Sequence, residues 1–171
     1  RIWGALVSGN YFSTVGVPLA LGRGIAPGED EVLGRDAVVV LGNSLWRKRF
    51  NADPAIAGKT VVLNARPYTV VGVVAPGFTG TDSGIVSDFW APLAMQAELL
   101  PELSRNRESR TSYWLTLNGR LRPGVSREQA VQRRTPPRQF ELGSDTVGRD
   151  VAPGEIGDQI GEFELAQAAD Q

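Results

Sequence analysis

The stretch that decides the fold runs from Asp36 to Phe78 and reads DAVVVLGNSLWRKRF NADPAIAGKTVVLN ARPYTVVGVVAPGF. Its first apolar, β-branched run, Ala37–Leu41, predicts a buried strand. Leu45–Phe50 follows with apolar residues on one side and basic residues on the other, which indicates a short helix begun at Asn43 or Ser44. A strand followed by a helix at this spacing favours a fold that mixes α and β elements.

The second half of this stretch contains a look-alike of a phosphate-binding loop, Asp53–Thr60. Such a loop begins with glycine, whereas this segment begins with the acidic Asp53, and Pro54 removes one backbone N–H donor. It must also lead into a helix, whereas the residues after Thr60 favour a strand. We therefore expect a hairpin of Lys59–Leu63 and Pro67–Val74, and no nucleotide binding.

The composition excludes several kinds of chemistry. The 171 residues include neither histidine nor cysteine, which removes serine–histidine relays, thiolate nucleophiles and most transition-metal sites. A net charge of −1 gives no overall attraction to nucleic acid. No apolar run is long enough to cross a bilayer. The sequence therefore predicts a chain that is not an enzyme and has no catalytic residue, no cofactor, no metal site and no nucleic-acid partner.

The segments on either side of the opening stretch carry further patterns. Ile2–Val7 predicts a strand, and Tyr11–Val15 predicts a short helix that Gly16 ends. Asp88–Leu93 is expected to be a strand that covers the core. The alternation of apolar and polar residues in Tyr113–Leu121 predicts one more strand.

The end of the chain has a different character. Ser126 and Gln129 have the spacing of a capping box, so a helix is expected to start directly after Ser126. Paired prolines interrupt it soon afterwards. Residues 1–132 carry a net positive charge, whereas residues 133–171 carry a net negative charge and many glycines and prolines. We expect these last residues to form a poorly packed tail with a short helix over Glu162–Ala169.

Tryptophan and arginine side chains supply the candidate contact residues. Trp46, Trp90 and the phenylalanines near them are expected to anchor the core. The other interpretation is a ligand platform, for which Trp90 and Trp114 are the candidates. Arg47 begins a basic run on the expected helix. A solvated face is one interpretation of this run, and a contact with a partner or a phosphate group is the other.

Several of these motifs, in this order, resemble the MacB-like periplasmic core domain of ABC transporter permeases of the FtsX-like class. The motifs are VSGNYFSTVGV at 7–17, VVVL at 38–41, LWRKRF at 45–50, GKT at 58–60, YTVVGV at 68–73, PGF at 76–78 and LRPGVSREQA at 121–130. The resemblance covers about residues 5–132.

The resemblance implies an α+β, β-rich fold of two subdomains. A porter-like subdomain would consist of residues 1–35 and 99–132 and be incomplete, an inserted α/β subdomain would consist of residues 36–98, and residues 133–171 would be an atypical tail. It also implies a non-catalytic domain on the periplasmic face of the bacterial inner membrane. Such a domain passes the effect of ATP hydrolysis, by a cytoplasmic ABC ATPase subunit or domain, to exported substrates or partner proteins.

The implied partners are that ATPase, reached through transmembrane helices, and a periplasmic adaptor protein, in a dimeric parent. Relatives in this family export macrolides, peptides or toxins, or handle lipoproteins. This sequence departs from the pattern because it contains no transmembrane helix and no ATPase motif, and because the helical pattern ends near Arg133. A fragment of a gene, an altered reading frame or an excised segment would each explain this. The alternative is a free-standing, extracytoplasmic β-rich module that binds carbohydrate or peptide.

Overall fold

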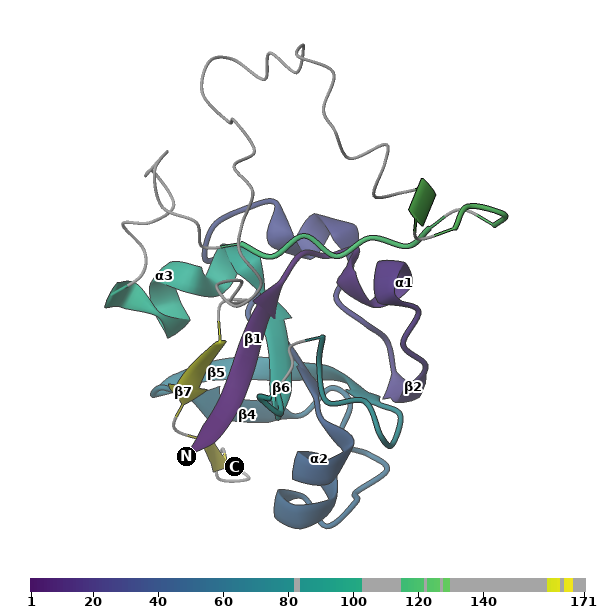
Figure 1. Cartoon of the computed structure of the whole chain (residues 1–171). Helices are drawn as coiled ribbons and strands as arrows, with labels where there is room; N and C mark the ends of the chain where they lie inside the picture. Colours follow the sequence, from purple (N-terminus) through teal and green to yellow (C-terminus); the bar gives the residue numbers. More distant parts are fainter. Residues whose placement is uncertain are drawn as a thin grey trace.

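The computed structural model (Figure 1) combines one mixed sheet with short helices, so the fold class is α+β, as the sequence predicts. The residues that the structure describes are 1–81, 84–102, 115–121, 123–126, 128, 129, 160–163 and 165–167. Within these residues, no helix has both the length and the apolar character that a membrane crossing requires.

The helices and strands follow one another in short steps along the chain. They are β1 (Ile2–Val7), α1 (Tyr11–Val15), β2 (Leu19–Gly22), the 3₁₀ helix η1 (Pro27–Asp30), β3 (Val38–Leu41), α2 (Asn43–Arg49), β4 (Thr60–Leu63), β5 (Arg66–Val74), β6 (Phe89–Pro92), the 3₁₀ helix η2 (Leu93–Met95), α3 (Gln96–Leu99), β7 (Ile160–Phe163) and β8 (Leu165–Gln167).

The predicted elements of the first hundred residues are confirmed to within about two residues. The β4–β5 hairpin turns at Asn64 and Ala65, whose φ angles of 48° and 63° are those of a two-residue turn with left-handed backbone. Gly16 ends α1 with a φ of 72°. The start of α2 differs from the expectation, because Gly42 is its N-cap and no side chain caps it.

The sheet is built around β5, which pairs with β3, β4 and β2. The strand order is β7-β1-β6-β3-β5-β4-β8, with β2 alongside β5. The pairs β1–β6 and β3–β5 are parallel, and the other pairs are antiparallel. Strands from residues 1–35 and from residues 36–98 therefore lie in one sheet, and the division into two subdomains stays a prediction.

The two ends of this strand order belong to one short piece of chain. β7 pairs with β1, β8 pairs with β4, and only residue 164 separates β7 from β8. Residues 160–167 therefore bridge both edges, and the sheet closes on itself. In Figure 1 the yellow strand β7 runs beside the purple β1.

Two clusters of apolar side chains fill the two faces of the sheet. Val39 and Leu41 of β3 point into one cluster, whereas Val40 points into the other, and all three are fully buried. Phe89 and Trp90 of β6 divide in the same way. The apolar run that predicted a buried strand is thus a strand covered on both faces.

Two sequence predictions near the end of the chain are wrong. Residues 115–121, part of the predicted strand Tyr113–Leu121, have no strand pairing; Tyr113 and Trp114 lie outside the described residues. The described residues of the predicted helix Glu162–Ala169 form β7 and β8 instead, since the edges of β1 and β4 supply backbone partners. Phe163 is 1% exposed in the core, so the expectation of a poorly packed tail is wrong at this residue. Tertiary contacts override local preference here.

The capping box is confirmed by two reciprocal hydrogen bonds. The Ser126 N–H donates to Gln129 Oε1 at 3.0 Å, and the Gln129 N–H donates to Ser126 Oγ at 3.2 Å. Residues 128 and 129 are helical.

Gly72 occupies a crowded position of the central strand β5. A Cβ atom there would lie 2.2 Å from the carbonyl oxygen of Arg23 and 3.0 Å from its nitrogen. The backbone at Arg23 cannot easily retreat, because its N–H donates to the carbonyl oxygen of Val71 at 2.9 Å. A side chain at this position must therefore push two backbone segments apart.

We predict that Gly72→Ala lowers the free energy of unfolding by about 2 kcal/mol, the usual cost of overfilling a packed site. Urea denaturation followed by tryptophan fluorescence measures it. Gly28→Ala is the matched control, since a Cβ at Gly28 meets nothing within 4 Å, and its midpoint should stay near that of the unchanged protein. Equal midpoints for the two variants would contradict this account of β5.

Candidate functional site

The turn that resembles a phosphate-binding loop is closed by its own side chains. Lys59 Nζ lies 2.7 Å from Asp53 Oδ2, and Asp53 Oδ1 accepts the Ala55 N–H at 2.9 Å. The hydrogen bond from Lys59 is the main reason that the pKa of Asp53 lies below its usual value. The Gly58 N–H donates to the carbonyl oxygen of Val70 at 2.7 Å. This turn enters a hairpin, and its geometry is not that of a phosphate cradle.

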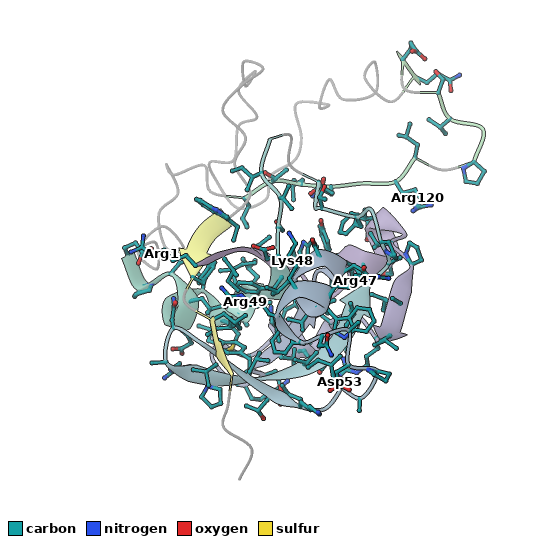
Figure 2. All side chains as sticks on the ribbon, turned by 90° about the horizontal axis from the view of Figure 1, so that it is seen from below. Arg1, Arg47, Lys48, Arg49, Asp53 and Arg120 are labelled. Carbon is teal, nitrogen blue, oxygen red and sulfur yellow. The ribbon has the colours of Figure 1, made fainter. Side chains whose placement is uncertain are left out.

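Helix α2 presents a basic face to solvent. Arg47, Lys48 and Arg49 are all exposed on its last turn, where cations interact favourably with the helix dipole (Figure 2). Arg47 Nε donates to Asn43 Oδ1 at 2.9 Å, and Asn43 Nδ2 donates to the carbonyl oxygen of Val74 at 3.2 Å. Arg47, a predicted contact residue, is therefore at the surface and is tied to the sheet through Asn43.

The structure places the two candidate tryptophans differently. Trp90 is fully buried, with its ring 6.0 Å from that of Phe12 and 5.2 Å from that of Phe78. The interpretation of Trp90 as a core anchor is confirmed by this burial, and its ring is inaccessible to a ligand unless the core opens. Trp114 lies outside the described residues, and so no described contact joins the three candidate residues.

Arg120 joins residues 115–121 to helix α1. Its Nε donates to the carbonyl oxygen of Thr14 at 3.0 Å, and its Nη2 donates to that of Val15 at 2.6 Å. These carbonyls belong to the last turn of α1, where no helical N–H reaches them. Sequence reasoning missed Arg120, because the contact joins positions 106 apart and leaves no local signal.

A groove of about 350 Å³ runs under residues 115–118. Its lining combines apolar side chains, such as Leu6 and Val7 of β1, with polar ones, and the lining residue Leu117 is 93% exposed. The lining residues are Leu6, Val7, Ser8, Asn10, Tyr11, Thr14, Leu93, Leu115, Thr116, Leu117 and Asn118. Such a surface suits an apolar segment better than a small charged molecule.

A second hollow, of about 330 Å³, lies beside Tyr68. Tyr68 is 1% exposed, and its hydroxyl has no hydrogen-bond partner among the residues that the structure describes. Burial, followed by the nearby charge of Glu98, raises the pKa of Tyr68 to about 12. Arg66 acts in the opposite direction and pairs with Glu98, with Arg66 Nη1 and Glu98 Oε2 2.6 Å apart.

The described residues contain no group of three or more acidic, histidine or cysteine side chains that could hold a metal ion. The candidate surfaces among the described residues are the basic face of α2, the apolar groove and the hollow beside the buried Tyr68 hydroxyl.

Comparison with known proteins identifies related sequences. The family described as the MacB-like periplasmic core domain matches residues 1–135. The macrolide export ATP-binding/permease protein MacB of Burkholderia pseudomallei is 39% identical over 74 residues, which are 42% of this chain and 11% of that protein. The protein of the same name from Aggregatibacter actinomycetemcomitans is 38% identical over 84 residues, 46% of this chain and 12% of that protein. The chain thus spans about a tenth of the length of the curated relatives it matches.

Two solved structures show a partial likeness. The periplasmic region of MacB from Actinobacillus actinomycetemcomitans aligns with a TM-score of 0.44 and 26% identity, over 57% of this chain and 41% of that one. The extracellular domain of the noncanonic ABC-type transporter YknZ from Gram-positive bacteria aligns with a TM-score of 0.45 and 17% identity, over 56% of this chain and 45% of that one.

We predict that Arg120→Ala frees residues 115–121 from α1, because two hydrogen bonds to the end of the helix are lost together. The chain has no cysteine, so spin labels can be attached specifically at Ser13→Cys and Leu117→Cys. Double electron–electron resonance then measures the distance between the two segments. The distance distribution should broaden in Arg120→Ala. It should not change in the control Lys48→Ala, which removes a cation from α2. Unchanged distributions in both variants would show that Arg120 does not hold the segment.

We predict that Tyr68→Phe stabilises the protein by about 1 kcal/mol at pH 7, because it removes a buried hydroxyl without a partner. Since the folded pKa of Tyr68 is raised from 10.0 to about 12, its phenol ionises first in the unfolded chain as the pH rises. The unchanged protein therefore loses stability between pH 10 and about 12, and the advantage of Tyr68→Phe grows over this range.

Urea denaturation across this pH range measures the effect. Tyr11→Phe is the control, because the Tyr11 hydroxyl lies 3.3 Å from Thr81 Oγ1, within hydrogen-bond distance, and its removal should destabilise the protein. A loss of stability in Tyr68→Phe equal to that in Tyr11→Phe would contradict the prediction.

Proposed function

The chain belongs to the family of MacB-like periplasmic core domains, and on that premise we propose that it acts as a non-catalytic, extracytoplasmic domain of an ABC transporter permease. The family match over residues 1–135 carries this proposal. The geometry of Asp53–Thr60 supports it, because the most enzyme-like motif of the chain is a turn closed by the Lys59–Asp53 ion pair.

The start of β1 marks the end of the sheet at which a membrane segment would be joined. Ile2, at the start of β1, lies opposite Phe163, at the end of β7. The chain then continues into β8, which pairs with β4. A membrane segment of a longer parent that precedes β1 would therefore tether the domain at this end of the sheet.

In this proposal the ATP is hydrolysed by a cytoplasmic ABC ATPase subunit or domain, and the transmembrane helices of a dimeric parent transmit the motion. A sheet closed by residues 160–167 moves as one packed body, so a displacement at its tethered end reaches the opposite surface. The receiving partner would be a periplasmic adaptor protein or an exported substrate. Arg47, exposed on α2, is the proposed contact residue for such a partner.

The proposed subdomain division keeps residues 36–98 as the inserted part and residues 1–35 with 99–132 as the porter-like part. The alternative of a carbohydrate- or peptide-binding module receives no support from Trp90, whose ring is fully buried. Its other candidate residue, Trp114, lies outside the described residues.

A chimera tests the proposed function. The segment of the Aggregatibacter MacB that corresponds to residues 1–135 of this chain, the part matched by the family, is replaced by those residues. Macrolide resistance is then measured in a bacterium that lacks its own macrolide exporters. We expect the chimera to retain part of the export activity, and the same chimera with Arg47→Glu to lose several-fold more than the chimera with Ser44→Glu on the same helix.

Membrane abundance, measured by immunoblotting, separates loss of function from loss of protein. A chimera that reaches the membrane at normal abundance and exports nothing would contradict the proposal. Isothermal titration of the isolated chain with Mg-ATP should give no saturable heat, and saturable binding would overturn the non-catalytic assignment.

A further inference from the structure

Residues 160–167 occupy a seat between two strand edges of the sheet. We use the name "closing strand" for β7 and β8 together. β7 lies antiparallel to β1 through the pairs from Ile2↔Phe163 to Ala5↔Ile160. β8 lies antiparallel to β4 from Val61↔Gln167 to Leu63↔Leu165. One short piece of chain thus satisfies two sheet edges at once.

An aromatic recess gives the closing strand its register. Phe163 meets the ring of Phe89 edge-on, with centroids 5.0 Å apart and planes 69° apart. The Phe89 ring in turn lies over Gly4, where a Cβ atom would be 2.1 Å from its Cζ. The seat between Ile2, Gly4 and Phe89 is therefore shaped for one large side chain, and a shift of one residue would turn Phe163 away from it.

Other elements hold both edges of the seat. β1 pairs in parallel with β6 from Gly4↔Phe89 to Val7↔Pro92. β4 is one arm of the β4–β5 hairpin. These pairings do not involve the closing strand, so they continue to hold both edges when it leaves. They would then present rows of unpaired backbone N–H and C=O groups, which favour the addition of a strand.

The length of the connecting sequence allows delivery from another molecule. Residues 130–159 precede the closing strand and would reach about 100 Å if fully extended, at about 3.3 Å per residue. The entropy cost of closing such a connection grows only with the logarithm of its length. A closing strand from a second copy would make the same hydrogen bonds and bury the same Phe163 side chain.

We propose that the seat between β1 and β4 is a strand acceptor that takes the closing strand of a second copy of this chain, so that two copies exchange strands. The inference goes beyond the proposed transport function and does not depend on it. The closing strand of the same chain competes with that of a second copy for the seat, at an effective concentration of about 1 mM. Exchange is therefore a minor state in dilute solution, and it grows with protein concentration or when the attached strand is disabled.

Cysteine trapping tests the exchange, because the chain has no cysteine of its own. Trp3 and Glu162 lie opposite each other in the register, a position from which paired cysteines can form a disulfide. The recipient carries Trp3→Cys with Phe163→Asp, which disables its own closing strand. The donor carries Glu162→Cys. We expect a disulfide-linked heterodimer on non-reducing gels after mild oxidation of the mixture.

Two controls test whether the disulfide depends on the position of the cysteine in the seat and on the Phe163 anchor. A recipient with Ser44→Cys in place of Trp3→Cys offers an exposed cysteine outside the seat, and a donor with Phe163→Asp lacks the aromatic anchor. Each should give at least five-fold less heterodimer. The double variant Trp3→Cys/Glu162→Cys, at low concentration, should close a disulfide within one chain and so show that the seat exists.

A second recipient keeps the test decisive if Phe163→Asp prevents folding. Trp3→Cys alone retains an intact seat, since Trp3 is 44% exposed, and its heterodimer with the donor should increase with protein concentration. The proposal is overturned if these mixtures give no more heterodimer than the Ser44→Cys control while the double variant closes, which would mean seating within one chain only. Failure of the double variant to close would overturn it as well.

Discussion

The crowding around β5 is the constraint on which the rest of the structure depends. β5 pairs on one side with β3 and on the other with β4 and β2, which take successive parts of its length. Val70 and Val73 face one core and Val74 faces the other, and all are fully buried. Gly72 is the point where the chain at Arg23 crosses over the strand. A strand with this many neighbours fixes the positions of the elements before and after it.

The two cores lie beneath different surfaces of the domain. The core around Phe89 faces the closing strand, whereas the core around Trp90 supports α1 and the groove beneath residues 115–118. Phe89 and Trp90 are adjacent residues of β6, so one short strand links the two surfaces. A change that moves β6 would reach both the strand seat and the groove. This is the structural reason to treat the domain as a single mechanical unit.

Sequence patterns correctly predicted the helices and strands that are specified by residues close together in the sequence. The β-branched runs gave β3, β4 and β5, because a strand buried on both faces must be apolar at successive positions. The closing strand was mistaken for a helix, because the recess at Gly4 and Phe89 that selects Phe163 is assembled from distant residues. In residues 115–121 the error is the reverse, because the alternation predicted a strand where the structure has none. Alternation identifies a segment able to pair, but it cannot show that β1 and β4 already have partners in β7 and β8.

The family match and the strands that complete the two edges of the sheet involve different parts of the chain. The family match ends at residue 135, whereas both edges of the sheet are completed by residues 160–167. Candidate contacts within the match, such as Arg47 on α2 and the groove held by Arg120, follow from the first part of the chain. Whether the edges of β1 and β4 are paired depends on residues 160–167. The two parts are coupled, because Phe163 belongs to the same apolar cluster as Val70 and Val73 of β5. Loss of the closing strand would leave the pairs of β5 with β2, β3 and β4 in place but would remove Phe163 from the core that they share.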